Sequence, residues 1–239
     1  MVTEQDEDEE WREEFELITS NRFLDADTKG HGAPEPCGCA SKGLRCNDDR
    51  CINYSTQTEC VSSQCGNKCT NQRFGKKQWR DIMIRKTPGK GHGLFANEDI
   101  EEGSFVAEYC GEIISEKAMA ARFKKQKTER HLFMQTISPG VYLDGQEAGS
   151  LVRFINHSCE PNAIHDRWVV NGRMCIGVFT TRAVSKGEEL SFDYRWEYVF
   201  CSMLFLPFLV LMSLSLSLSL SLSYPSIASY LPSLTRHEV

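Results

Sequence analysis

The sequence predicts a mostly β domain with one helical insertion, preceded by a small Cys-rich module that needs metal to fold. Many short apolar runs are separated by Gly, Pro and Asn turns, and one stretch alone has helical character. Seven of the eleven cysteines fall between Cys37 and Cys69. With 239 residues and 41% hydrophobic side chains, the chain can bury one medium-sized core beside such a module.

Residues 1–33 are expected to be an acidic N-terminal tail with a short helix. Residues 1–16 hold nine acidic side chains and one Arg, a charge of −8, so the remainder of a chain with net charge −6 sums to +2. Trp11, Phe15 and Leu17 could end the tail in a short docking helix. No signal peptide or basic amphipathic leader begins the sequence, so we expect a reducing compartment, in which cysteines bind metal before they form disulfides.

Residues 34–78 are rich in Cys, Asn and Ser and hold few aliphatic side chains, so a hydrophobic core cannot stabilise them. The cysteine spacing is C-x-C-x6-C-x4-C-x8-C-x4-C-x3-C. Zinc prefers four thiolates in a tetrahedron, and seven is one short of two sites unless one thiolate bridges two ions. The alternative is a secreted module stapled by disulfides, which the odd count and the missing leader disfavour.

Residues 79–196 read as a globular domain of short strands. A helix is expected from Ser115 to about Arg130, with Ser115 as its N-cap and Ala118, Ala120 and Ala121 inside. The expected strands are Asp81–Arg85, Ser104–Tyr109, Val141–Asp144, Trp168–Val170, Met174–Phe179 and Glu189–Phe192.

Polar motifs in this domain mark a candidate site. Gly89, Gly91 and Gly93 surround Lys90 and His92 in a turn whose backbone can approach a ligand closely, although such a loop is more often only a turn. Tyr109 begins a Tyr-Cys-Gly-Glu sequence and, taken alone, is typical of a core residue. Core packing explains Asn156-His157-Ser158 poorly, because buried polar side chains need partners.

The segments 90–96, 153–162 and 189–194 resemble the SET-domain protein lysine methyltransferases, and the cysteine spacing resembles the AWS module that precedes SET in one branch of them. The resemblance implies a β-clip fold with a pseudoknot, in which Arg153–His157 is threaded under the chain carrying Phe192-Asp193-Tyr194. It also implies two zinc ions in residues 34–78. One would take Cys37, Cys39, Cys46 and Cys51, and the other would share Cys46 and add Cys60, Cys65 and Cys69.

The same resemblance implies S-adenosylmethionine as cofactor and assigns residues to it. Methyl transfer to an amine is an in-line displacement that depends on positioning and on a neutral amine, and a desolvated channel near a sulfonium disfavours the ammonium form. Tyr194 is the expected catalytic residue, with Tyr109 beside it. Tyr194 is also assigned to the cofactor site, with Lys90, Gly91, His92, Gly93, Arg153, Phe154, Asn156 and His157.

Residues outside these motifs carry further expectations. His131, Leu132 and Phe133 lie where relatives line the lysine channel, and the degree of methylation stays open. His165 and Trp168 are expected in a hairpin, as a solvated and a packing residue respectively.

The implied substrate is histone H3 in nucleosomes, with lysine 36 favoured, in the nucleus on chromatin. The resemblance is to H3 methyltransferases related to the absent-small-or-homeotic-discs protein, particularly the plant homologues. Basic side chains could meet DNA phosphate, a contact without sequence information. The basic residues are Lys76, Lys77, Arg80, Arg122, Lys124, Lys125 and Lys127. A solvated helix face explains the last four of these residues equally well. The oligomeric state of the protein stays open.

Residues 197–239 are an atypical hydrophobic tail with Ser-Leu repeats in place of the family's post-SET segment. In the family, Cys159 would bind a third zinc with three cysteines that follow the catalytic Tyr, but only Cys201 lies beyond Tyr194. A third zinc is therefore not expected, and the alternative function is a chromatin-binding protein with impaired catalysis.

Residues 199–223 carry no charge and include five Ser-Leu repeats at 213–222. We weigh three interpretations of this stretch. A membrane anchor is disfavoured because residues 199–212 are short for a span of ~20 residues, and an alternating strand would be aggregation-prone. Translated intron, from a pyrimidine-rich nucleotide repeat, is favoured.

Overall fold

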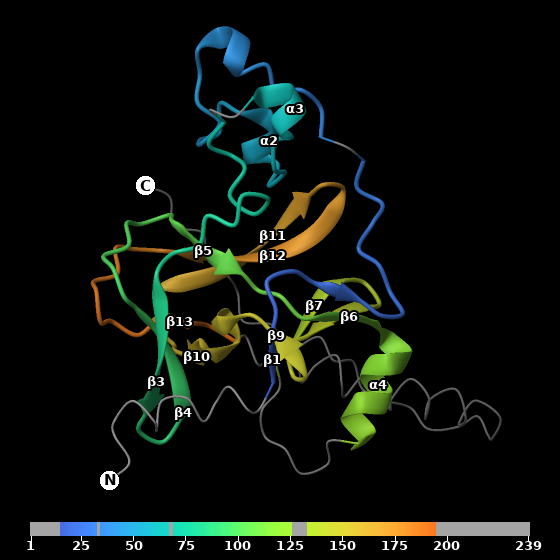
Figure 1. Ribbon diagram of the computed structural model, residues 1–239, viewed down its shortest axis with the longest axis vertical. Helices are drawn as coiled ribbons and strands as arrows, with labels where there is room; N and C mark the ends of the chain where they lie inside the picture. The colour runs from blue at the N-terminus through green and yellow to red at the C-terminus, as the bar shows by residue number, and fades with distance from the viewer. Residues whose placement is uncertain (1–14, 33, 67–68, 126–132, 195–239) are drawn as a thin grey trace, which may run out of the picture. The chain divides into compact units, whose positions relative to one another are not determined.

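The computed structural model describes residues 15–32, 34–66, 69–125 and 133–194 (Figure 1). Residues 79–194 are dominated by short strands, as expected for a mostly β domain. A three-stranded sheet has the order β11-β12-β5 and a four-stranded sheet the order β2-β6-β8-β7, and three two-stranded sheets pair β3 with β4, β10 with β13 and β1 with β9. The helix in this region is the helical insertion α4 (Glu116–Lys125), drawn in green in Figure 1.

The strands are short because Gly and Asn turns interrupt them. Their bounds are β1 (Glu16–Leu17), β2 (Arg22–Phe23), β3 (Ile82–Thr87), β4 (Gly91–Ala96), β5 (Phe105–Glu108), β6 (Glu112–Ser115), β7 (Met134–Ser138), β8 (Val141–Asp144), β9 (Ala148–Gly149), β10 (Asn156–His157), β11 (Ala163–Val170), β12 (Arg173–Thr180) and β13 (Ser191–Phe192). Asn171 and Gly172 turn β11 into β12 with φ of 51° and 75°, a region that Asn and Gly tolerate.

The main core consists mostly of aliphatic side chains, contributed by β3 to β8 and by β11, β12 and β13. Leu94, Ile113, Leu143, Ile155 and Val178 are each fully buried. The predicted strands at 81–85, 104–109, 141–144 and 174–179 are confirmed within a few residues. Their apolar positions supply many of these buried side chains.

Helix α4 begins where the sequence places its N-cap. The Ser115 hydroxyl accepts a hydrogen bond from the backbone N–H of Ala118 at 3.3 Å, which satisfies one of the unpaired donors of the first turn. Ser115 also donates to the Asp25 carboxylate at 2.6 Å. The N-cap prediction is confirmed, while residues 126–130 of the predicted helix lie outside the described residues.

The N-terminal segment from residue 15 to residue 29 is part of the β domain, where the sequence predicted a tail and a docking helix. β1 pairs in parallel with β9, and β2 pairs in parallel with β6 at the edge of the four-stranded sheet. Phe15 is buried against Phe154, with ring centroids 5.6 Å apart. The prediction of a tail to residue 33 is thus wrong from residue 15 onward, because exposed strand edges of the domain offer the backbone partners that a free tail lacks.

Residues 34–78 form a Cys-rich module with little regular structure. It contains a 3-10 turn η2 (Ala40–Lys42) and the short helices α2 (Ile52–Ser55) and α3 (Ser62–Cys65). A second 3-10 turn, η3 (Leu151–Phe154), lies in the β domain. Cys39, Cys46, Cys51, Cys60 and Cys69 make up the buried cluster of the module.

A backbone hydrogen bond and the contacts of Arg73 with aromatic rings join the Cys-rich module to the β domain. The backbone of Glu59 donates to Val169 of β11 at 2.8 Å, and the guanidinium of Arg73 lies 5.1 Å from the Trp168 ring and 5.0 Å from the Phe179 ring. Trp168 is 4% exposed, which confirms its predicted packing role.

Candidate functional site

The cysteines of the module form two groups that fit a metal ion. Cys37, Cys46, Cys51 and Cys60 have Sγ atoms within 4.8 Å of one another, and so do Cys46, Cys60, Cys65 and Cys69. Four thiolates around zinc at about 2.3 Å are about 3.8 Å apart. The observed Sγ–Sγ distances of 3.6 Å for Cys37–Cys46 and 3.9 Å for Cys51–Cys60 agree with that geometry.

The second group is the set that the sequence assigned to one zinc, whereas the first differs by one residue. Cys60 stands in it where Cys39 was expected, although Cys39 is also buried, at 1% exposure. Cys46 and Cys60 both belong to both groups, so the geometry offers two candidates for the bridging thiolate where the resemblance named Cys46. Burial raises the pKa of the Cys51 and Cys60 thiols, and a bound cation would reverse that preference for the protonated form.

Two buried amides support Cys60, and sequence reasoning missed both. Asn53 and Asn71 donate to its Sγ at 3.5 and 3.4 Å. Such donors orient a ligating thiolate and offset part of its charge. The sequence shows that residues 34–78 are rich in Asn. Nothing in the spacing of these residues indicated which Asn would reach which sulfur.

The candidate cofactor site is built around Asn156 of β10. Its side-chain amide donates to the His92 carbonyl of β4 at 3.2 Å and to the Glu189 carboxylate at 2.8 Å. Three segments that the sequence singled out, 90–96, 153–162 and 189–194, therefore meet at one side chain. Glu189 was not among the predicted site residues.

Gly93 permits this meeting because no side chain would fit there. A Cβ on Gly93 would lie 2.7 Å from both Glu189 Oε1 and Thr87 Oγ1, and 3.0 Å from Asn156 Nδ2. The predicted flexible turn is confined to residues 87–90, and residues 91–96 are strand β4. Lys90 lies in that turn and is exposed.

Two buried polar atoms, one on β3 and one on β4, indicate a polar ligand. Thr87 Oγ1 and His92 Nε2 are buried and have no hydrogen-bond partner in the described part of the chain. An unsatisfied buried donor or acceptor costs about 1–3 kcal/mol. Since a bound molecule with polar groups would satisfy both atoms, the site fits the amino-acid or adenine end of the expected cofactor.

Strand pairing brings Tyr194 to the same place. β10 and β13 are parallel, with Asn156 opposite Ser191 and His157 opposite Phe192. The backbone N–H of Tyr194 donates to His157 Nδ1 at 3.2 Å, and its hydroxyl donates to the Ile155 carbonyl at 2.7 Å. Burial, with the nearby Glu189 charge, raises the pKa of Tyr194 to about 12. The hydroxyl is therefore protonated at neutral pH and retains acceptor capacity for an amine N–H.

Tyr109 is a core residue whose hydroxyl also reaches the backbone of Phe133. It is 2% exposed and belongs to the core, yet its hydroxyl donates to the Phe133 carbonyl at 3.4 Å, where the lysine channel was expected. Burial raises its pKa further above the ordinary range. His131 and Leu132 lie outside the described residues.

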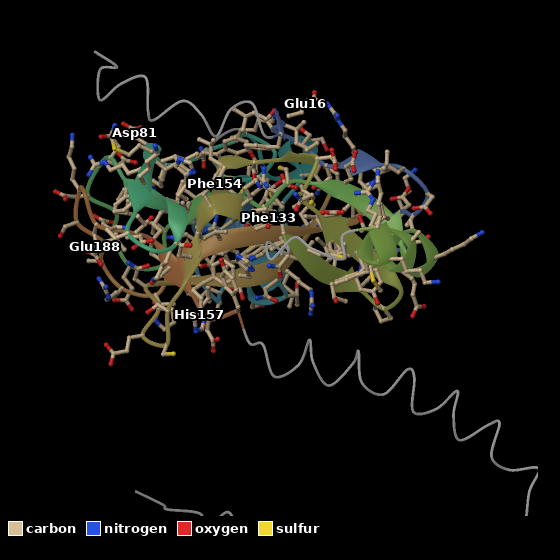
Figure 2. All side chains as sticks on the ribbon, turned by 90° about the horizontal axis from the view of Figure 1, so that it is seen from below. Glu16, Asp81, Phe133, Phe154, His157 and Glu188 are labelled. Carbon is tan, nitrogen blue, oxygen red and sulfur yellow. The ribbon has the colours of Figure 1, made fainter. Side chains whose placement is uncertain are left out.

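Arg153 is buried among aromatic rings. Its guanidinium carbon lies 4.1 Å from the Phe15 ring centroid, 3.8 Å from that of Phe133 and 5.2 Å from that of Phe154; Figure 2 labels Phe133 and Phe154. Phe154 contacts the His92 ring edge-on at 6.1 Å. Arg153 thus links the N-terminal segment to the predicted channel wall, a connection that the sequence did not indicate.

The basic residues considered for DNA differ in their surroundings. Arg122 donates a 2.7 Å hydrogen bond to Asp144 and forms a 2.7 Å ion pair with Glu112, so it ties α4 to β8 and β6. Lys77 donates to Thr19 at 2.8 Å, Lys124 and Lys125 are exposed, and Lys127 lies outside the described residues.

Cys110, Cys159 and Cys175 belong to neither of the two metal-ligand groups. Cys159 is exposed, with its Sγ 3.5 Å from His157 Nε2, and Cys175 lies on β12 as predicted. Cys201 and the stretch 199–223 lie outside the described residues. Within the four described ranges, no helix has the length and apolar character needed to cross a membrane.

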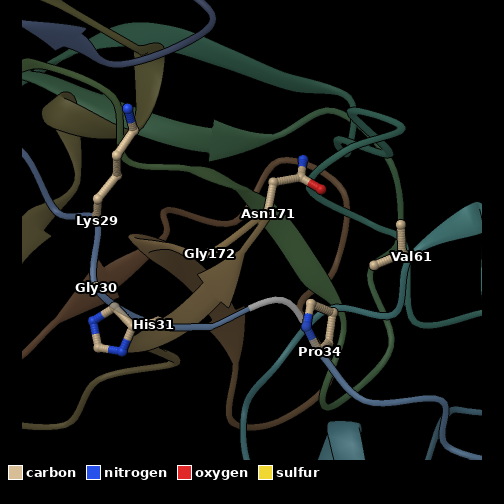
Figure 3. Close-up of a pocket in the computed structure, with 7 residues that line it drawn as sticks. All are labelled: Lys29, Gly30, His31, Pro34, Val61, Asn171 and Gly172. Atoms are coloured by element: carbon tan, nitrogen blue, oxygen red, sulfur yellow. The ribbon is translucent and has the colours of Figure 1, made fainter.

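Two surface cavities lie away from this site. One, of about 490 Å³, is shown in Figure 3 and is lined by Lys29, Gly30, His31, Pro34, Val61, Asn171 and Gly172. The other, of about 430 Å³, adjoins it through His31 and Pro34. None of the predicted site residues lines either cavity.

Comparison with known proteins agrees with this geometry. The SET domain family matches residues 91–195. The chain is 38% identical over 209 residues to "Histone-lysine N-methyltransferase, H3 lysine-36 specific" of Debaryomyces hansenii, an alignment that covers 82% of this chain and 29% of that protein. It is 35% identical over 195 residues to "Histone-lysine N-methyltransferase ASHH2" of Arabidopsis thaliana, which covers 78% of this chain and 11% of that protein.

Solved structures show the same fold. A chain in the crystal structure of the Chaetomium thermophilum polycomb repressive complex 2 superposes with a TM-score of 0.59 at 26% identity, over 70% of this chain and 24% of that chain. The chain thus spans less than a third of the length of the relatives and solved chains named here.

Proposed function

Because this chain is a SET-domain protein, we propose that it transfers a methyl group from S-adenosylmethionine to the amine of lysine 36 in nucleosomal histone H3. The observation that carries the proposal is the meeting of segments 90–96, 153–162 and 189–194 at Asn156, with Tyr194 beside them. The choice of lysine 36 follows the name of relatives such as the Debaryomyces protein.

Named residues would hold the cofactor. Asn156 and His157, with the backbone at His92 and Gly93, would take its polar ends, and Phe154 would pack beside them. When bound, S-adenosylmethionine supplies a methyl carbon that accepts the amine lone pair as the carbon–sulfur bond breaks and its electron pair stays on sulfur.

The protein's own residues orient the target amine and exclude water from it. Tyr194 accepts an amine N–H, which aims the nitrogen lone pair along the line of transfer. Tyr109 and Phe192, at 2% and 7% exposure, exclude water from the same region. A lysine brought there loses hydration, which favours the neutral amine, and its proton leaves to solvent.

We also propose two zinc ions in residues 34–78 and a location in the nucleus on chromatin. Cys46, Cys60, Cys65 and Cys69 hold one zinc; the other lies among Cys37, Cys39, Cys46, Cys51 and Cys60. The exposed Lys124 and Lys125 remain candidates for DNA phosphate contacts.

A methylation assay tests the function. Purified zinc-containing protein is incubated with S-adenosylmethionine and recombinant nucleosomes, and histone tail peptides are analysed by mass spectrometry. We expect methylation at lysine 36 and none on nucleosomes in which that lysine is arginine. Methylation confined to another lysine would overturn the substrate, and no methylation at all would overturn the enzymatic function.

A further inference from the structure

His165 of β11 is a polar ring among the aromatic residues of the proposed active site, and the mechanism above does not use it. Its ring centroid lies 3.8 Å from that of Phe192 and 5.5 Å from that of Tyr109. Phe192 in turn lies 4.7 Å from Tyr194. The sequence predicted a solvated His165, whereas the residue is half-buried and its ring packs on the Phe192 side chain.

One ring nitrogen of His165 lacks a partner. Nε2 is buried and makes no hydrogen bond with any part of the chain that the structure describes. Burial lowers the pKa of His165 to about 4, so the ring is neutral at physiological pH. A neutral imidazole carries one N–H and one lone pair, and leaving either buried and unused is unfavourable. The position therefore calls for a partner that arrives with a substrate.

The target amine is the partner that the surroundings favour. His165 lies between Tyr109 and Phe192, and one ring further is Tyr194, the proposed acceptor for an amine N–H. The neutral lysine amine has two N–H groups. If Tyr194 accepts one, the other needs an acceptor on another side of the nitrogen, and a neutral imidazole can supply it.

We propose that His165 is a specificity-determining residue, whose imidazole accepts the second N–H of the target amine and limits how many methyl groups are added. This inference rests on the proposed function. Each transfer replaces one N–H by N–CH3, with the proton lost to solvent. A third transfer requires an amine whose two substituents are both methyl groups, so neither hydrogen bond remains and the imidazole occupies the space that one methyl needs. The protein therefore stops mainly at the mono- and dimethyl products.

The test compares rates on three substrates. Nucleosomes carrying unmodified, monomethylated or dimethylated lysine 36 are each methylated by the full chain and by His165→Ala, His165→Phe and His165→Asn. Products are counted by mass spectrometry. The control His31→Ala changes an exposed histidine far along the chain from the site residues and should behave as the unaltered protein.

The decisive readout is the rate on the dimethyl substrate divided by the rate on the unmodified one. Because one methyl group in a pocket is worth about tenfold in discrimination, His165→Ala should raise this ratio by about tenfold. His165→Phe keeps the volume without the nitrogen, so it should lower the rate on unmodified lysine without raising the rate on the dimethyl substrate. His165→Asn keeps an acceptor and should fall between.

The outcomes separate the possible failures. A variant that only folds poorly loses all three rates together. An unchanged ratio in His165→Ala and His165→Asn that retain their rate on unmodified lysine would overturn this inference. An unaltered protein that methylates none of the substrates would instead overturn the proposed function.

Discussion

Asn156 and Gly93 show how a few residues create the site. The Asn156 amide bonds to both His92 and Glu189 because the chain at Gly93 has no side chain to separate them. The sequence marked both residues as site candidates by resemblance. Their mutual contact depends on the packing of β4 against β10, which no local pattern encodes.

Gly93→Ala tests that close approach. The added methyl would meet three atoms at 3.0 Å or less, so Asn156 and Glu189 must shift. We expect S-adenosylmethionine binding, measured by titration calorimetry, to weaken by about tenfold, or about 1.4 kcal/mol. The matched control is Gly32→Ala, where a Cβ meets nothing within 4 Å. Equal affinities in the two variants would contradict the assigned site.

Tyr194→Phe tests whether Tyr194 orients the target amine without contributing to cofactor binding. The variant loses the hydroxyl that donates to Ile155 and would accept the amine, while the ring still packs on His157 and Phe192. Turnover should fall by about 100-fold or more, as when one preorganised hydrogen-bonding group is removed from an active site. Cofactor affinity should change little. Tyr142→Phe, on β8, is the control, and unchanged turnover in Tyr194→Phe would refute the catalytic role.

The helix and strands that the sequence predicted correctly are those that a local sequence pattern determines. The Ser115 cap and the apolar runs of β3, β5, β8 and β12 follow from propensity and periodicity. The N-terminal strands were missed because β1 and β2 are only two residues long and are stabilised by pairing with β9 and β6, which lie about 90 to 130 residues away. Asn21 fixes this segment by donating to Glu108 at 3.1 Å and accepting from the Gly111 N–H at 3.0 Å.

Glu108, at the end of β5, should make stability depend on pH. Burial raises the pKa of its carboxyl to about 7, so the folded state holds a proton that the unfolded state releases above its ordinary pKa. The stability contribution is fully present below about pH 4. It is lost as pH rises toward 7, up to about 3 kcal/mol.

Glu108→Gln should remove this slope and raise the free energy of unfolding at pH 8. The measurement is urea denaturation between pH 5 and pH 8. The control Glu160→Gln alters an exposed carboxylate and should preserve the slope. A slope that persists unchanged in Glu108→Gln would show that another group causes it.

At the scale of the molecule, the Cys-rich module and the β domain are joined by backbone bonds at Glu59 and Val169 and by Arg73 among four aromatic rings. Since the buried hydrophobic cluster of the module consists of thiols, we expect its fold to depend on metal. Loss of metal should then also destabilise β11, which these contacts join to the module.

Zinc analysis of the purified chain should find two ions per molecule. Cys69→Ser should retain one, because the group of Cys37, Cys46, Cys51 and Cys60 does not include Cys69. Cys175→Ser, outside both groups, should retain two. Chelation should lower the melting temperature of the unaltered protein. One zinc or none in that protein would contradict the assignment.

The sequence by itself determined the β class, the capped helix, the metal-binding character of residues 34–78 and the motifs of the site, because periodicity, caps and ligand spacing are local properties. Tertiary structure decided which thiols lie together, which carboxylate meets Asn156, how residues 15–29 join the sheets and where His165 packs. These depend on contacts between segments far apart in the chain, whose geometry is set by the packed core.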